Sequence, residues 1–270
     1  MATRDKILSL LEEHKNSYVS GVEIAEKLGL SRNAIWKAIE ELRKSGYKID
    51  AVTRRGYCLT ECPDYLTEEG VRKNVIFPIE FYDEIGSTNV RAKELAIAGA
   101  SSPTVVLAAS QNSGNGSRNH SFYSPKGGIY LSLLLRPDEH FPEEVLSNPQ
   151  EMKKLAGEAA VSAVRDVCGL ELSYEKNDLY LGEKKVGGIL TEAGKEYESD
   201  YIQWVVIGIG LNVRIRQEDF PEDIRERAGS LMTVKEDKGA APADQEAPPY
   251  KESEPVMNRL ASALILNLLQ

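Results

Sequence analysis

Hydroxyl side chains placed between a predicted strand and a predicted helix are the first candidates for chemistry in this chain. Ser87 and Thr88 follow a short strand predicted at residues 79–82 and precede a helix predicted at residues 90–98. Their hydroxyls and the N-terminus of that helix would face one point, which suits a small polar or anionic ligand. Ser and Thr also cap helices in general, so this feature alone favours a structural role.

A polar, glycine-bearing loop follows the next predicted strand, at residues 104–110. The loop runs over residues 111–120, and Gly114 and Gly116 allow its backbone to approach a ligand closely. Successive backbone amides there, together with Arg118, could bind an anion. Composition alone favours a flexible surface loop.

The elements that would position these side chains form an α/β domain. In the last of its strands glycine recurs at every second residue, where side chains would otherwise crowd a neighbour or a ligand. The elements are a buried strand at residues 128–135, an alanine-rich helix at 155–168, and strands at 174–181, 184–192 and 203–213.

The first sixty residues predict a separate, helical unit. Apolar residues recur at helical spacing in three stretches, at residues 4–14, 22–28 and 32–44. Gly29 is placed to end the second helix, and Ser31 is a suitable N-cap for the third. Two helices joined by a tight turn of this kind form a helix-turn-helix, in which the later helix enters the major groove of DNA.

A basic β-hairpin is predicted after the third helix. Alternating residues at 47–52 and 57–59 flank two arginines and a glycine, which predicts a wing. Trp36 shares the apolar stripe of the third helix, so we interpret it as a core residue rather than one that stacks on a base. The alternative is a small helical bundle whose cations are merely solvated. The candidate DNA contacts are Arg32, Asn33, Lys37, Arg54 and Arg55.

Charge is distributed unevenly along the chain. The formal net charge is −9, yet residues 1–63 hold 11 Lys and Arg against 9 Asp and Glu, while the remainder holds 22 against 33. The only plausible phosphate-facing surface is therefore N-terminal.

Composition favours a cytoplasmic protein. The sequence shows no basic-plus-apolar signal segment and no apolar run near the length of about 20 residues that spans a bilayer. Its 3 cysteines and 3 histidines are too few and too scattered for a disulfide framework or a metal site. We therefore expect neither a membrane partner nor a structural metal.

Five motifs in one order resemble the biotin protein ligase family. They lie at residues 86–89, 111–118, 177–180, 185–190 and 208–213. Together with the N-terminal winged helix, the resemblance covers nearly the whole chain and points to the bifunctional ligase/repressor form of the family. It implies an α/β domain of the α+β type, with a mixed sheet, related to class II synthetases.

The resemblance also implies ligands and partners. Members of the family make biotinyl-5'-adenylate from biotin and ATP and pass biotin to a lysine of a biotin carboxyl carrier protein. In the bifunctional form the adenylate is the corepressor of a homodimer that binds operator DNA. Mg²⁺ and the carrier protein would be needed here only if the ligase reaction survives.

Carried over position by position, the resemblance assigns roles to individual residues. Ser87, Thr88 and Gln111 match contacts to the biotin head, and Phe122 occupies an aromatic position associated with the adenine. Arg118 matches one of the loop arginines that serve catalysis. The other pocket residues that it implies are Asn89, Gly114, Gly116, Asn177, Gly188, Gly210 and Asn212.

Two departures from the family weaken the expected chemistry. The family loop Gly-Arg-Gly-Arg-Arg-Gly reads Gly-Asn-Gly-Ser-Arg-Asn at residues 114–119, so two of its three cations are missing. The family motif Lys-Trp-Pro-Asn-Asp begins here with Tyr174, which removes a lysine that stabilises charge during adenylation. Lys176, expected on the same strand face as Tyr174, is the available substitute. Losing such cations commonly lowers a rate by orders of magnitude.

The C-terminal part departs as well. The sequence predicts a DNA-binding domain at residues 1–63, a linker at 64–66 and a ligase-like domain at 67–270, with a disordered loop at 234–255. Family members end in a small SH3-like barrel, and the sequence stops at residue 270 before any such barrel. We therefore expect either a fragment or a form without that barrel.

The sequence therefore favours a transcriptional regulator that senses biotin or biotinyl-adenylate and has weak or lost ligase activity. One alternative is an active bifunctional ligase and repressor. Another is a regulator that senses a different small acid, because Tyr174 and Ser117 could reshape the pocket.

Overall fold

The computed structural model describes residues 3–44, 47–61, 65–117, 120–138, 141–196, 201–232 and 256–270. Contacts divide the chain into two compact units. The head contains the described residues up to 61, and the α/β unit contains those from 65 onward. Arg118 and the predicted disordered loop at 234–255 lie outside the described residues.

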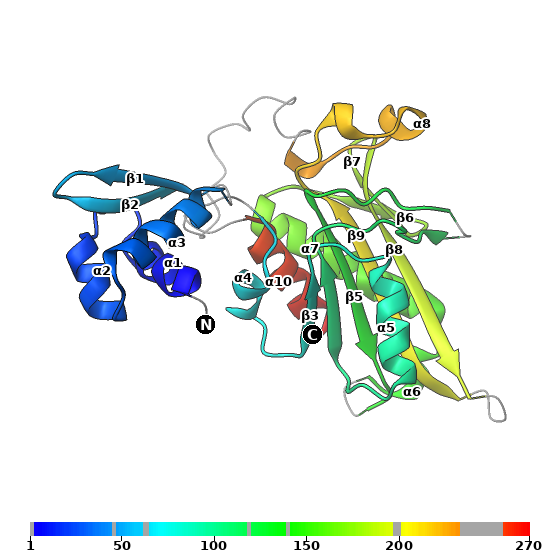
Figure 1. Ribbon diagram of the computed structural model, residues 1–270. Helices are drawn as coiled ribbons and strands as arrows, with labels where there is room; N and C mark the ends of the chain where they lie inside the picture. Colours follow the sequence, from blue (N-terminus) through cyan, green and yellow to red (C-terminus); the bar gives the residue numbers. More distant parts are fainter. Residues whose placement is uncertain are drawn as a thin grey trace. The chain divides into compact units, whose positions relative to one another are not determined.

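The head is built from three helices (Figure 1). They are α1 (Thr3–Glu13), α2 (Gly21–Leu28) and α3 (Arg32–Lys44). At the start of α2 the hydroxyl of Ser20 accepts a hydrogen bond from the amide of Glu23. Gly29 ends that helix in the left-handed conformation at φ 67°. The amide of Ala34 donates to the hydroxyl of Ser31 (3.2 Å), which caps α3. The helix-turn-helix prediction is confirmed.

A two-stranded wing completes the head. Strands β1 (Lys48–Val52) and β2 (Gly56–Glu61) pair antiparallel. Gly56 has φ 104°, and a Cβ atom there would come within 2.0 Å of the carbonyl oxygen of Val19. Only glycine lets the wing lie this close to the segment that precedes α2. The predicted wing is therefore present.

The prediction that Trp36 is a core residue is wrong. Its side chain is 54% exposed, whereas Ile35, Ala38, Ile39 and Leu42 are buried against α1 and the wing. Those four positions recur at intervals of three and four residues and form the stripe that faces the core. Trp36 follows Ile35 by one residue, about 100° further round the helix, and so lies beside the stripe rather than in it.

The α/β unit is organised around one mixed sheet (Figure 1). Its first two strands in space run parallel, and every other neighbouring pair is antiparallel. The predicted fold class, an α/β domain with a mixed sheet behind a winged helix, is confirmed. In spatial order the strands are β3 (Ile79–Tyr82), β4 (Thr104–Ala108), β5 (Gly128–Leu135), β9 (Ile202–Asn212), β8 (Lys184–Lys195), β7 (Asp178–Leu181) and β6 (Ser173–Glu175).

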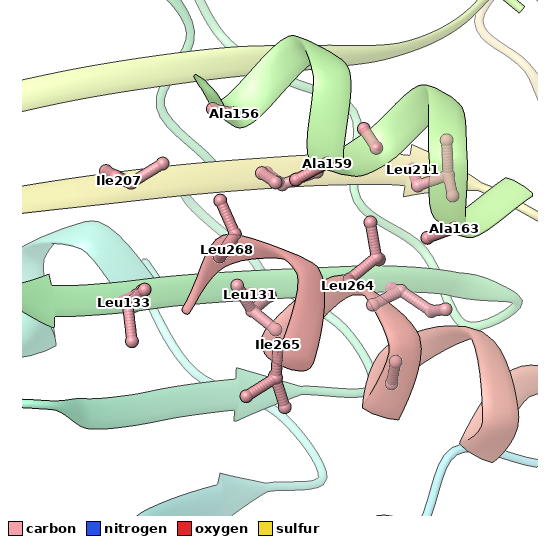
Figure 2. Packing of buried hydrophobic residues seen from close by; sticks show 14 of the residues in the cluster. Leu131, Leu133, Ala156, Ala159, Ala163, Ile207, Leu211, Leu264, Ile265 and Leu268 are labelled. Atoms are coloured by element: carbon pink, nitrogen blue, oxygen red, sulfur yellow. The ribbon is translucent and has the colours of Figure 1, made fainter. Parts of the chain in front are cut away.

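Helices cover both faces of the sheet. Helix α5 (Thr88–Ile97) packs its alanines on one face, over Val106, Leu134 and Val206. Helices α7 (Pro149–Cys168) and α10 (Val256–Leu268) pack on the other face, and Figure 2 shows their alanine and leucine side chains against the strands. The main core therefore lies on the α7 and α10 face, and a smaller apolar cluster lies under α5. Short helices at α4 (Glu68–Arg72), α6 (Glu143–Leu146) and α8 (Glu222–Arg225) and a 3-10 turn at η2 (Gln217–Asp219) complete the unit.

One predicted strand is interrupted. The stretch 174–181 consists of β6 and β7 joined by Lys176 and Asn177, whose φ angles are 49° and 84°. Positive φ at two successive residues belongs to a tight hairpin turn and not to a strand. Within the described part of the chain no helix is long and apolar enough to cross a bilayer.

Candidate functional site

A network of hydrogen-bonded side chains lies on the α5 face of the sheet. The amide and hydroxyl of Thr88 donate to Gln111 Oε1 at 2.8 and 3.1 Å, and Gln111 Nε2 donates to the hydroxyl of Ser124 (2.9 Å). The hydroxyl of Ser132, in the middle of β5, donates to Asn89 Oδ1 (2.6 Å) and lies 2.8 Å from Thr88 Oγ1. Helix α5, the polar loop and β5 therefore meet at one point.

Ser87 adds a hydroxyl to this site. It occupies the N-cap position of α5, yet its side chain makes no capping hydrogen bond. The residue is 5% exposed and lines the same cavity as Thr88 and Gln111. The Ser87 hydroxyl therefore does not cap α5, as a serine at this position usually does, and it is available to a ligand.

Glycines form the floor of the cavity. A Cβ atom on Gly210 would lie 2.5 Å from the ring of Phe122, and one on Gly188 would lie 3.4 Å from it. Gly208 faces Asn89, because a Cβ atom there would come within 2.0 Å of Asn89 Oδ1. The strands thus omit side chains where the polar network and the aromatic ring approach them.

In this conformation the cavity is small. Its volume is about 30 Å³, the room of a single water molecule. Phe122 covers the glycine floor and makes an edge contact with Tyr130, with ring centroids 6.4 Å apart. Burial raises the pKa of Tyr130, so its hydroxyl stays protonated and donates to the carbonyl of Pro125 (2.7 Å). Phe122 therefore occupies much of the space above the glycine floor.

A larger cleft opens on the other side of the polar loop. Its volume is about 570 Å³, and Gln111, Gly114 and Phe122 line it together with Lys126 and Asp223. Gln111 and Phe122 also line the small cavity. The two spaces are therefore separated by side chains of this loop.

An ion pair between Lys93 and Glu192 supports the network. Asn89 Nδ2 donates to Glu192 Oε2 (3.0 Å), and Lys93 Nζ lies 2.8 Å from Glu192 Oε1. The pair fixes the orientation of the Asn89 amide, so that its oxygen faces Ser132. Sequence reasoning missed Ser132 and Glu192. The available signal for Ser132 was a lone hydroxyl in an apolar strand.

The glycine loop differs from the predicted anion site. The amide of Gly116 donates to the carbonyl of His120 (2.7 Å), so it is not free to bind an anion. Gly114 is buried, and a Cβ atom there would lie 2.5 Å from the carbonyl oxygen of Phe122. Both glycines allow the loop to fold back on itself. Arg118 is outside the described residues, so its place in the site stays a prediction.

The expected position of Lys176 is wrong. Lys176 is exposed in the turn between β6 and β7 and does not share a strand face with Tyr174. Tyr174 packs over Gly157 of α7, where a Cβ atom would lie 2.4 Å from the ring. It therefore lies on the face of the sheet opposite the cavity, and burial raises its pKa. Neither residue lines the cavity.

A different lysine lies near the glycine floor. Lys185 Nζ is 2.7 Å from Asp178 Oδ1, and that carboxylate oxygen would be 3.7 Å from a Cβ atom on Gly188. The lysine belongs to one of the motifs that sequence reasoning singled out, but it was not selected as a site residue. Within the described residues, no group of three or more His, Cys, Asp or Glu is placed to hold a metal ion.

Two predicted pocket residues lie beside the cavity rather than around it. The carbonyl of Asn177 accepts the amide of Ile189 (2.7 Å), so its backbone supports the strand that carries Gly188. Asn212 Nδ2 donates to the carbonyl of Gly229 (3.1 Å), whereas its buried Oδ1 accepts no hydrogen bond from the described residues. A buried acceptor without a donor suits a ligand or a water molecule.

The candidate DNA contacts in the head are exposed. Arg32, Asn33 and Lys37 lie on the first two turns of α3, and Arg54 is at the tip of the wing with φ 70°. Within the described part of the chain, none of these four side chains makes a hydrogen bond or an ion pair. The guanidinium of Arg55 stacks on Tyr18, 4.2 Å from the ring centroid, which limits its freedom.

Two families match the two units. Residues 3–58 match a family described as HTH domain, and residues 82–212 match the biotin/lipoate A/B protein ligase family. The second range contains the polar network, the loop glycines and the glycine floor described above.

Similar whole proteins carry both functions in their names. The chain is 36% identical over 242 residues to the bifunctional ligase/repressor BirA of Bacillus subtilis (strain 168), which covers 87% of this chain and 72% of that protein. It is 29% identical over 221 residues to the bifunctional ligase/repressor BirA of Escherichia coli (strain K12), covering 78% and 64%. The biotin protein ligase of Aquifex aeolicus, solved with biotin and ATP, is similar in structure, with TM-score 0.51, 26% identity, and 71% of this chain and 70% of that chain covered.

Proposed function

Because this chain belongs to the bifunctional ligase/repressor BirA family, we propose that it is a transcriptional regulator of the biotin-repressor type. Its α/β unit senses biotin or biotinyl-5'-adenylate, and its ligase reaction is weak or lost. We assign DNA binding to residues 1–63 and ligand binding to residues 67–270, joined by a linker at 64–66. The working form is a homodimer on operator DNA in the cytoplasm.

The observation that carries this proposal is the convergence of Ser87, Thr88 and Gln111 on one cavity above a glycine floor. Hydroxyl and amide groups of this kind can donate to and accept from a neutral polar ring such as the biotin head. The Aquifex aeolicus ligase was solved with biotin and ATP, and the similar ligase of Leishmania major with biotinyl-5-AMP. Of the other proposed pocket residues, Asn89, Phe122, Gly188 and Gly210 also line this cavity.

The nucleotide end of the ligand has a separate place in this proposal. The cleft of about 570 Å³ beside Gly114 and Phe122 has room that the small cavity lacks. Displacement of Phe122 would join the two spaces, and its ring could then stack on the adenine. Asn212 offers a buried acceptor, Gly116 shapes the loop, and Asn177 supports the neighbouring strand.

The placement of cations supports the proposal of a weak ligase reaction. Adenylation builds up negative charge at the attacking carboxylate and the α-phosphate, and preorganised cations stabilise that charge. Tyr174 replaces the family lysine and packs on α7, Lys176 is exposed in a turn, and two loop arginines are replaced by asparagine and serine. We keep Arg118 as the proposed remaining catalytic cation of the loop.

The position of Lys185 favours a second candidate function, an active bifunctional ligase and repressor. This cation is paired with Asp178 close to Gly188, where it could serve a phosphate if the pair opened. Mg²⁺ and a biotin carboxyl carrier protein would then be required.

Titration of the full chain with biotin, with and without ATP, tests the proposal. Calorimetry should detect biotin binding, and mass analysis after incubation with ATP should find little biotinyl-adenylate and little biotin on an added carrier domain. Turnover comparable to that of an ordinary family ligase would overturn the weak-ligase proposal and support the second candidate. Absence of binding by both biotin and synthetic biotinyl-adenylate would indicate a different small acid.

A further inference from the structure

An indole ring stands exposed on the helix that carries the candidate DNA contacts. Trp36 is 54% exposed, on the second turn of α3. Single exposed apolar residues are common on protein surfaces and need no explanation by themselves. The side chains near Trp36 indicate the kind of partner that its ring contacts.

Polar and cationic side chains lie near the ring on the exposed side of α3. Arg32 precedes Trp36 by four residues and Asn33 by three, which places both one turn away along the face of Trp36. Lys37 is adjacent in sequence and exposed. In the described head, the other large apolar residues with high exposure are Val22, on α2, and Val52, in the wing. Glu40, four residues after Trp36, pairs with Arg43 (2.8 Å). The indole is therefore an apolar surface with cationic and polar side chains on its N-terminal side, where a recognition helix meets base edges.

We propose that Trp36 is a sequence-reading residue that packs against the 5-methyl group of a thymine in the major groove. The inference rests on the proposed DNA-binding function of the head. Arg32 and Lys37 favour a polyanion over an apolar protein partner on this face. A recognition helix presents its N-terminal half to base edges, and Trp36 is the fifth residue of α3.

The chemistry of the major groove selects the thymine methyl group. Phosphates attract cations, and an indole carries no charge, so Trp36 adds little to the salt-dependent part of the affinity. The thymine methyl is the apolar feature that base pairs present in the major groove, and apolar side chains contact it there. Trp36 therefore contributes to sequence preference, whereas Arg32 and Lys37 contribute to attraction by the backbone.

Thymine-to-uracil substitution tests the contact directly. A random-sequence duplex library is first selected on the full wild-type chain in the presence of biotinyl-5'-adenylate. Anisotropy titrations then compare the selected duplex with versions in which single thymines are replaced by deoxyuridine, which removes only the methyl group. We expect one such position to weaken wild-type binding about threefold to tenfold, as loss of one buried methyl group does. Trp36→Ala should lower the affinity for the thymine duplex by a similar factor. Replacing the sensitive thymine by deoxyuridine should then cause no further loss in this variant.

Matched variants separate this role from others. Val22→Ala removes a comparably exposed apolar side chain from α2 and should keep the uracil response. Lys37→Ala should weaken binding to all duplexes and keep the uracil response as well. Thermal unfolding checks that Trp36→Ala remains folded, which we expect because the ring lies outside the buried stripe.

The experiment distinguishes failure of the Trp36 contact from failure of DNA binding by the head. If Trp36→Ala keeps wild-type affinity and uracil sensitivity, or changes only the oligomeric mass, the proposed contact is wrong while DNA binding by the head stands. If the wild-type chain selects no sequence from the library, the proposed DNA-reading function fails, and the role of Trp36 fails with it.

Discussion

In the head, Arg32, Asn33 and Lys37 are exposed and make no hydrogen bond or ion pair within the described residues. In the α/β unit, by contrast, Thr88 is bonded to Gln111, and Ser132 links Thr88 to Asn89. A surface that meets DNA keeps its charges solvated and ready for phosphates. In the pocket most polar groups are satisfied by internal partners, although the Ser87 hydroxyl makes no capping bond and Asn212 Oδ1 has no donor among the described residues. Damage to the pocket should therefore affect both ligand affinity and stability, and damage to the head should affect DNA affinity alone.

Substitution Gly208→Ala should produce the largest loss of stability. The new Cβ atom would lie within 2.0 Å of Asn89 Oδ1, which Ser132 and Glu192 hold in place through hydrogen bonds to the Asn89 amide. Overpacking of this kind typically costs about 1–3 kcal/mol, and we expect the upper end because two bonds break with it. Urea unfolding measures the change. Gly86→Ala is the control, since the nearest atom to its Cβ would be 3.9 Å away.

Substitution Gln111→Ala should cost about 1–3 kcal/mol of unfolding free energy and weaken biotin binding. It removes the acceptor of the Thr88 amide and one of the two hydrogen bonds of the Ser124 hydroxyl, which still donates to the carbonyl of Phe122. Calorimetry with biotin and urea unfolding should show both losses in one variant. The neighbouring Asn112→Ala, at an exposed position, should show neither. If Gln111→Ala lost biotin affinity but kept its full unfolding free energy, the proposed difference between the two units would be wrong.

In the head, Arg32→Ala and Lys37→Ala should separate binding from folding. Each should lower DNA affinity and reduce the slope of log affinity against log salt by about 1, because each removes one phosphate contact. Neither should change thermal unfolding, since both side chains are exposed and without internal partners in the described structure. Arg165→Ala, on an exposed position of α7, is the charge-matched control and should leave the salt slope unchanged.

The smallest expected effect belongs to an ion pair that fixes α5 to the edge strand. Arg91 Nε lies 2.9 Å from Glu80 Oε2, and this bond holds the pKa of Glu80 below its usual value. A folded-state pKa below the unfolded one stabilises the fold above the unfolded value, and that stabilisation is lost as the pH falls through the folded pKa.

Glu80→Gln should therefore reduce stability at neutral pH by less than about 1 kcal/mol, because the pair is partly exposed. Unfolding measured from neutral to acid pH should show the difference from wild type disappear in acid. Glu94→Gln, at a side chain 60% exposed, should have a smaller effect. A difference that grows in acid would contradict the direction of the pKa shift.

Local signals predicted most elements of both units. The cap residue Ser31 and the stop residue Gly29 located the helices of the head, because each acts through its own backbone neighbours. Trp36 was misplaced because helical periodicity assigns a stripe only to within about one residue, or 100°. In the α/β unit α5 begins two residues before the predicted helix, since Thr88 and Asn89 were assigned to the preceding turn.

The site was predicted only in part because its remaining members act across the fold. Ser132 and Glu192 reach Asn89 from β5 and β8, so their role depends on strand order, which no local pattern contains. The error at Lys176 has a local cause. A two-residue turn with positive φ, lacking the usual glycine, was taken as continuous strand.

We propose that occupancy of the α5-face cavity controls DNA binding by the head. The most direct test is the affinity of the full chain for its selected duplex, measured by anisotropy as synthetic biotinyl-5'-adenylate is added. We predict that affinity rises along the ligand's own binding curve, and that Gln111→Ala shifts this rise to higher ligand concentration. DNA affinity that stays constant while calorimetry shows the cavity saturated would contradict the account.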